Sequence, residues 1–447
     1  MNNFDSSPSR WPLLLRGALV AAGIVALSNA TLAAAQDSKP PTINIGQIAP
    51  FTGSAAEFGA FYEDGAQLAV QQINTAAEEV FGGPIIGKLV TADSATLPTP
   101  AIEGARKLVQ VNGVPAIIGG WSSGVTIAVA ESVTIPSGVL QVANGATSPL
   151  LSVLPSDNDA DLLFRTTSPD TFQGIVAAQL ANGEIIDDNK YQTASTIYIN
   201  NPYGQGLSNS FADAFKERGG KILNQVPHPE EVQPTYRSQL SAALKEDPDL
   251  LAVVSYPGHT SVILKEARDF FDIDKYQFVD GNKSEAVVKA VGADTLAGSF
   301  GTAPGQDPES QGYQQFSKSY KSEMNRDRIP PFTTSAYDAA IVIGLALAKA
   351  VADDLSAEEI TGAALRDRLR PVSNSPGTKV TGGTQEGVTK ALQMIADGQD
   401  IDYIGASGAV DFNDAGDVVT PMVIWKYTAD GKIETVGYQK AEDIPEK

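Results

Sequence analysis

The 447-residue chain contains no cysteine and only two histidines, and each shortage excludes a class of site. Without cysteine, the chain forms no disulfide even in an oxidising compartment and offers no thiolate to a metal. His228 and His259 do not stand at the spacing of paired metal ligands. We therefore predict a protein that holds no metal and needs no cofactor.

Basic residues are also scarce relative to acidic ones. The chain has 53 aspartates and glutamates against 32 lysines and arginines, a formal net charge of −21. This balance disfavours binding to DNA, RNA or anionic membrane surfaces, which recruit basic patches. We interpret the acidity as a source of solubility and predict no nucleic-acid partner.

The N-terminal segment has the features of an export signal. Arg10 and Arg16 precede an apolar stretch at 17–27. Ala33 and Ala35 stand at the spacing that signal peptidase accepts. A retained membrane anchor would need roughly 20 apolar residues, so a cleaved leader is the better interpretation. We predict a signal peptide at 1–35 and, because no cysteine can be acylated, a periplasmic protein that is not a lipoprotein. We find no later apolar run that approaches membrane length and predict that nothing after the leader spans a bilayer.

The remainder of the chain is too long for one simple core and suits two domains. From residue 42 to about 168, short β-branched runs alternate with stretches whose apolar residues recur at helical spacing, a pattern typical of βαβ units in a parallel sheet. The expected strands are 43–48, 88–92, 116–119 and 138–142, and the expected helices are 57–77, 98–111 and 124–132.

The same alternation restarts near residue 169 and indicates a second doubly wound unit. Its expected helices are 169–182, 204–219, 234–245 and 259–271, and its expected strands are 196–200, 222–226, 251–255 and 277–280. Long helices at 309–325 and 335–351 need a sheet to cover, which suggests that the chain returns to the first unit. Segments 409–417 and 421–427 have the pattern of antiparallel strands around an Asn-Asp-Ala-Gly turn.

Seven short motifs then point to one family. They are Phe-Thr-Gly-Ser-Ala-Ala-Glu-Phe-Gly at 51–59, Gly-Ala-Gln-Leu-Ala-Val-Gln-Gln-Ile-Asn at 65–74, Ile-Gly-Gly-Trp-Ser-Ser at 118–123, Gly-Ala-Thr-Ser-Pro at 145–149, Phe-Arg-Thr-Thr at 164–167, Asn-Pro-Tyr-Gly-Gln-Gly at 201–206 and Tyr-Asp-Ala at 337–339. In this order and spacing the chain resembles, from about 42 to 437, the branched-chain amino-acid-binding (Leu/Ile/Val-binding-protein-like) family of periplasmic substrate-binding proteins.

The resemblance implies an α/β fold of two doubly wound parallel-sheet lobes joined by a three-strand hinge, the type I periplasmic binding protein. Expected lobe I is 42–166 plus 303–417, lobe II is 167–302 plus 418–437, and a tail follows at 438–447, with crossovers near 165–168, 300–303 and 418–421. The family also implies hinge closure around an amino acid or related small carboxylate. The implied partner is an ABC permease and ATPase complex of the inner membrane, served by a monomer.

Candidate ligand contacts of lobe I lie in loops that follow strands, where open α/β sheets bind ligands. By resemblance, Ser123 matches the serine that binds the ligand α-carboxylate, and Trp121 matches an apolar pocket position. The Gly145 carbonyl and the Thr147 hydroxyl match contacts to the amino-acid head group. Phe58 matches an aromatic pocket residue.

In lobe II, Tyr203 and Tyr256 match the tyrosines that close over the ligand, and both directly follow expected strands. The chain departs from the family at Asn282, where the amino-acid binders have a glutamate against the ligand ammonium. Asp280, two residues earlier, could supply that charge, whereas Lys283 could favour a ligand with an extra carboxylate or with no amine. Ligand identity therefore stays open at this point.

Other functions must be weighed against this interpretation. Gly-Trp-Ser-Ser-Gly at 120–124 fits the G-x-S-x-G pattern of α/β hydrolases with Ser122 as the nucleophile, but the triad histidine normally comes late in such chains. Residues 411–417 have some features of a calcium loop, although a turn explains them better. A periplasmic ligand sensor for a membrane receptor would share every feature of a transport protein.

Overall fold

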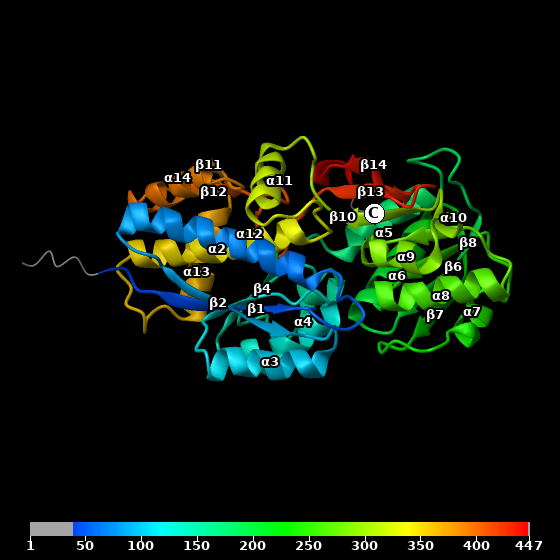
Figure 1. The fold of residues 1–447 in the computed structure, drawn as a ribbon, viewed down its shortest axis with the longest axis horizontal. Helices are drawn as coiled ribbons and strands as arrows, with labels where there is room; N and C mark the ends of the chain where they lie inside the picture. Colours follow the sequence, from blue (N-terminus) through cyan, green and yellow to red (C-terminus); the bar gives the residue numbers. More distant parts are fainter. Residues whose placement is uncertain (1–38, 446–447) are drawn as a thin grey trace, which may run out of the picture. The chain divides into compact units, whose positions relative to one another are not determined.

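The computed structural model describes residues 39–445, and its first sheet is entirely parallel (Figure 1). The strand order is β2-β1-β3-β4-β5. The strands are β1 (Ile43–Ala49), β2 (Ile86–Asp93), β3 (Ala116–Ile118), β4 (Leu140–Ala143) and β5 (Leu163–Arg165). β1 is buried along nearly its whole length, as a central strand covered on both faces should be.

Helices cover both faces of this sheet because its central strands are apolar on both sides. Ile45 and Ile118 share one core cluster with α2 (Gly59–Phe81), whereas Ile48 and Ile117 share another with α3 (Pro98–Gln110) and α4 (Ser123–Val129). Alternate residues of each strand thus face opposite layers. The π turn η1 (Ala130–Thr134) continues α4, and the 3₁₀ turn η2 (Pro149–Val153) follows β4.

The second sheet has the order β14-β13-β10-β9-β8-β6-β7. Its strands are β6 (Thr193–Ile199), β7 (Lys221–His228), β8 (Leu250–Val254), β9 (Tyr276–Phe278), β10 (Phe300–Pro304), β13 (Met422–Tyr427) and β14 (Ile433–Gln439). Its helices are α5 (Asp170–Ala181), α6 (Pro202–Glu217), α7 (Arg237–Ala243), α8 (Pro257–Phe270), α9 (Glu285–Val291) and α10 (Ala293–Leu296), with the 3₁₀ turn η3 (Asp280–Asn282). Its five parallel strands repeat the winding order of the first sheet, which confirms the predicted fold class.

The predicted hairpin of 409–417 with 421–427 is wrong. β13 occupies the second segment, but it pairs antiparallel with β10 on one side and β14 on the other. Residues 410–421 contain no strand, because Asn413 Oδ1 accepts the N–H groups of Ala415 and Asp417 and folds a tight turn there.

The chain returns to the first sheet after β10. The returning elements are α11 (Gln311–Glu323), α12 (Thr333–Ala352), α13 (Gly362–Ser373), β11 (Thr378–Thr381), α14 (Gln385–Ala396) and β12 (Ile401–Ile404), of which β11 and β12 form a separate parallel pair. Figure 1 shows α12 running beside α2. The two helices pack so closely that a Cβ on Gly344 would lie 2.7 Å from the Ile73 side chain.

α12 also corrects the prediction that no apolar run after the leader approaches membrane length. Its 20 residues are long and apolar enough to cross a bilayer by length and composition. However, 83% of its apolar window is buried inside the protein, and its residues belong to the core cluster of the first sheet. A helix that is apolar all round is expected at such a fully covered position.

Three crossover segments connect the sheets and lie against one another. The Ser168 hydroxyl accepts the Thr420 N–H at 2.6 Å, and the Gly305 N–H donates to the Pro421 carbonyl at 2.9 Å. Two expected boundaries fall inside strands, since β10 spans the limit between 302 and 303 and β14 continues past 437. Ile444, assigned to the tail, is only 6% exposed in a core cluster with α5. The division into two lobes remains our proposal.

Candidate functional site

Four predicted aromatic residues meet where the winding of each sheet reverses. Phe58 and Trp121 follow β1 and β3, whereas Tyr203 and Tyr256 follow β6 and β8. Their ring centroids are 4.7 Å apart for Trp121 and Tyr256, 5.4 Å for Tyr203 and Tyr256, and 5.6 Å for Phe58 and Trp121. Reversal points are where open α/β sheets bind ligands. The structure therefore brings these side chains from both sheets into one buried cluster.

Tyr62 and Phe332 join this cluster and were not predicted. Tyr62 lies one helical turn after Phe58, and the two ring centroids are 6.1 Å apart. That spacing was a usable signal, because residues four apart share a helix face. Phe332 precedes α12, and only the packing of α12 against α2 brings it near.

The hydroxyl groups of the first sheet come from two loops that are bonded to each other. Ser123 begins α4, and its Oγ accepts the Ser148 N–H at 3.1 Å, which leaves its own hydrogen available to a ligand oxygen. The Thr147 hydroxyl is buried and has no hydrogen-bond partner in the described part of the chain, although it lies near enough to the Asp170 carboxyl to lower the pKa of that acid. Buried polar groups are normally paired, so this hydroxyl points to a ligand contact.

Gly145 lies directly under the indole of Trp121. A Cβ at this position would be 2.2 Å from Trp121 Cδ1, so only glycine permits this approach. The indole Nε1 is buried without a hydrogen-bond partner among residues 39–445. Trp121 therefore offers a donor as well as an apolar face.

Two buried carboxyl groups stand beside these loops. Asp280 accepts hydrogen bonds from Gln173 Nε2 and the Tyr203 hydroxyl, each at 2.9 Å, and burial raises its pKa to about 6. Asp170, at the start of α5, was not predicted. Both of its carboxyl oxygens are buried without a partner in the described structure, while its N–H donates to the Thr147 carbonyl at 2.7 Å. Burial and then the neighbouring Asp280 raise the pKa of Asp170 well above its usual range.

Asn282 uses its whole side-chain amide to hold its own loop. Its Oδ1 accepts the Val279 N–H, and its Nδ2 donates to the Ser255 carbonyl and to the Thr260 hydroxyl. The neighbouring Lys283 lines a cavity of about 360 Å³ together with Arg328. Burial lowers the pKa of Lys283 to about 8.

The two histidines are not placed to activate Ser122. The Ser122 Oγ accepts the Tyr256 hydroxyl at 3.0 Å. His228 bonds the Ser255 hydroxyl through Nε2, and His259 bonds the Glu230 carbonyl through Nε2, each at 2.9 Å. Burial lowers the pKa of His228 to about 3 and that of His259 to about 4. The geometry therefore gives no support to the hydrolase interpretation.

The segment 411–417, which has some features of a calcium loop, instead provides Asp417 as the partner of a buried arginine. Asp417 pairs with the buried guanidinium of Arg165 at 2.7 Å. Across residues 39–445, no group of three or more histidine, aspartate or glutamate side chains is placed to hold a metal ion.

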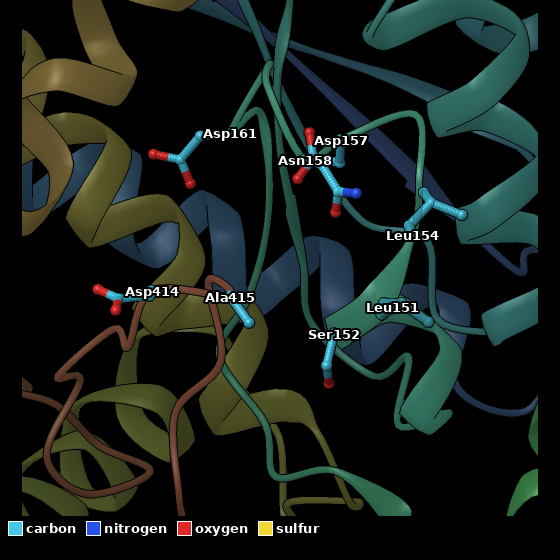
Figure 2. Close-up of a pocket in the computed structure, with 8 residues that line it drawn as sticks. All are labelled: Leu151, Ser152, Leu154, Asp157, Asn158, Asp161, Asp414 and Ala415. Carbon is cyan, nitrogen blue, oxygen red and sulfur yellow. The ribbon is translucent and has the colours of Figure 1, made fainter.

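A separate pocket of about 230 Å³ lies away from the aromatic cluster. Figure 2 shows Asp161 and Asp414 on one side of it and Leu151 and Leu154 on the other. The Asp161 carboxylate is already paired with Arg370 at 2.6 Å. No predicted ligand contact lines this pocket, so the aromatic cluster with its two acids remains the candidate site.

Comparisons with known proteins identify the family of this chain. Residues 42–380 match the profile of a family described as periplasmic binding protein. The chemotactic signal transduction system substrate-binding protein BasB of Halobacterium salinarum is 26% identical over 401 residues, which cover 88% of each chain. The Leu/Ile/Val-binding protein BraC3 of Rhizobium johnstonii is 30% identical over 320 residues, which cover 69% of this chain and 79% of that protein.

A solved structure shows the same fold. The crystal structure of a leucine binding protein from Thermotoga maritima superposes with a TM-score of 0.70 at 22% sequence identity. The superposition covers 90% of this chain and 99% of that one. The two proteins therefore share the same overall fold.

Proposed function

Because this chain belongs to the periplasmic binding protein family, we propose that it captures an amino acid for an ABC importer. Membership of the family confirms the resemblance predicted from the sequence. The family consists of substrate-binding proteins and implies an extracytoplasmic location. The name of the Leu/Ile/Val-binding relative supports an amino acid as ligand. Cleavage after Ala35, which lies outside the described residues, and a monomeric state are part of the proposal.

The pair of buried acids carries the proposal. Two carboxyl groups buried side by side are costly unless a positive charge joins them. Both oxygens of Asp170 lack a hydrogen-bond partner in the described structure. Burial and Asp280 raise the pKa of Asp170, and the nearby Thr147 hydroxyl and Arg165 guanidinium offset only part of that rise. A ligand ammonium placed between Asp170 and Asp280, with the Thr147 hydroxyl and the Gly145 carbonyl beside it, would satisfy these groups.

The other contacts follow from the same placement. The Ser123 hydroxyl donates to the ligand carboxylate, and Phe58, Trp121, Tyr203 and Tyr256 enclose the side chain. Tyrosine suits this position because it has a broad apolar face and a polar tip. Asn282 supports the site indirectly, because it fixes the turn that carries Asp280.

A ligand sensor is the second candidate function. The name of the Halobacterium relative, a chemotactic signal transduction system substrate-binding protein, supports it. A deletion strain distinguishes the two outputs. Lost uptake of labelled leucine supports transport, and lost taxis with normal uptake supports sensing.

Isothermal titration of three probes tests the proposed ligand class. L-Leucine carries both head groups, 4-methylpentanoate lacks the amine, and 3-methylbutylamine lacks the carboxylate. We expect L-leucine to bind at least ~10-fold more tightly than either analogue, because each analogue loses charged hydrogen bonds of roughly 1.5–3 kcal/mol. Equal binding of L-leucine and 4-methylpentanoate would contradict the role of the acids. A lack of binding by every proteinogenic amino acid would refute the proposed function.

A further inference from the structure

Glu57 joins the loop before α2 to the start of α9, a helix between β9 and β10 of the second sheet. Its carboxylate accepts the Ser284 hydroxyl, the Glu285 N–H at 3.2 Å and the Ala286 N–H at 3.4 Å. Ser284 is itself the N-cap of α9. A carboxylate at a helix N-terminus is stabilised by the unpaired N–H groups and by the helix dipole.

Arg328 makes the reciprocal contact from the segment before α12. Its guanidinium lies 3.1 Å from Glu57 and 3.7 Å from the Glu285 carboxylate. It also lies 4.6 Å from the centroid of the Phe61 ring on α2. Glu57 and Arg328 thus lie beside helix α2 of the first sheet, whereas Ser284 and Glu285 lie at the start of α9, beside the second sheet.

These charged groups are partly buried, so solvent screens the interaction between them less than it screens a surface ion pair. The Glu57 side chain is 12% exposed and that of Arg328 is 29% exposed, unlike the surface pairs that contribute little. Charged hydrogen bonds of this kind are roughly twice as strong as neutral ones. Neither Glu57 nor Arg328 belongs to the aromatic cluster or to the pair of acids.

We propose that Glu57 and Arg328 form a latch that receives the N-terminus of α9 and holds the two lobes closed without touching the ligand. The inference rests on the proposed closure of two lobes. Contacts made only in the closed form shift the opening equilibrium and change apparent affinity by the fraction of closed protein. Because only Lys283 and Ser284 separate η3 from α9, the latch also restrains the turn that carries Asp280.

Distances between spin labels test the latch. The chain has no cysteine, so Lys107→Cys on α3 and Lys265→Cys on α8, both exposed, give two unique labelling sites. Glu57→Gln and Arg328→Met are compared with the parent, with and without L-leucine. We expect both variants to populate longer distances and to bind L-leucine about tenfold more weakly, as expected for the loss of a charged hydrogen bond.

Two matched variants control for charge and packing. Glu78→Gln makes the same change at an exposed position of α2. Arg326→Met removes the other arginine over Phe61, whose guanidinium forms a salt bridge with Asp64 and with no other carboxylate of residues 39–445. Both should keep the parent distances. Superimposable distributions for the parent, Glu57→Gln and Arg328→Met in both conditions would overturn the latch. If calorimetry shows that the parent binds no proteinogenic amino acid, the amino-acid proposal fails separately, and the ligand-free distributions alone decide the latch.

Discussion

At the scale of single residues, the burial of Asp280 lowers the stability of the ligand-free protein, and a substitution should reveal this effect. Burial raises its pKa from 3.8 to about 6, so the folded protein holds this proton at pH values where the unfolded chain has lost it. Ionisation of Asp280 therefore lowers the free energy of unfolding as the pH rises from about 4 to about 6. The loss is complete above about pH 6 and absent below about pH 4.

Asp280→Asn should stabilise the ligand-free protein because asparagine is never charged. We expect the free energy of unfolding at pH 8 to rise by on the order of 2 kcal/mol, with no gain at pH 4. The same variant should lose most of its affinity for L-leucine. Urea unfolding at the two pH values and calorimetry provide the measurements. A variant less stable than the parent at pH 8, with affinity unchanged, would contradict both roles.

Single residues also show what the sequence could and could not reveal. The family resemblance predicted Phe58 and Trp121 as pocket residues. Tyr203 and Tyr256 were predicted by the resemblance and also by their position directly after strands, whose carboxyl ends gather at one edge. Asp170 was not predictable in this way, since it opens a helix and becomes a ligand candidate only through its tertiary neighbours. The substitution of Asn282 for the family glutamate was visible, but its use within its own loop was not.

At the scale of elements, Arg165 ties the first crossover to the third. Its guanidinium is 1% exposed, pairs with Asp417 and donates to the Ala146 and Ser148 carbonyls that flank Thr147. Arg165→Met would leave Asp417 buried without its partner, which typically costs about 3–5 kcal/mol. We expect a loss of that size in urea unfolding, together with weaker L-leucine binding.

The exposed pair of Lys275 and Asp274 provides the control for this prediction. Its side chains are 55% and 85% exposed, so Lys275→Met should change stability by no more than about 0.5 kcal/mol. An Arg165→Met protein with the parental unfolding midpoint would show that the crossovers do not depend on this pair.

Elements with weak patterns were the ones missed. β14 is an edge strand with no fully buried residue, so it lacks the apolar alternation that marks a strand. The predicted hairpin failed for a related reason, because the polar turn at Asn413 was taken as a connection between strands. The segment 353–408, with α13, β11, α14 and β12, packs on the first sheet through contacts distant in sequence.

At the scale of the whole molecule, two sheets with the same winding order meet at the aromatic cluster. The point where the winding reverses in each sheet lies next to this cluster. The repeat of the βα pattern made this arrangement predictable, whereas the contacts between the sheets were not. Glu57 with α9 and Tyr256 with Ser122 join residues more than 100 positions apart. Such contacts depend on how the sheets meet, which no local pattern encodes.

A crystal structure with a bound amino acid tests the central claim most directly. The protein would be crystallised with L-leucine, or with the amino acid that raises its melting temperature most, since a ligand of the native state stabilises it. We predict an ammonium group within about 3 Å of both Asp170 and Asp280, with the ligand carboxylate on the Ser123 hydroxyl. A ligand bound outside the aromatic cluster, or one whose ammonium contacts neither acid, would contradict the account.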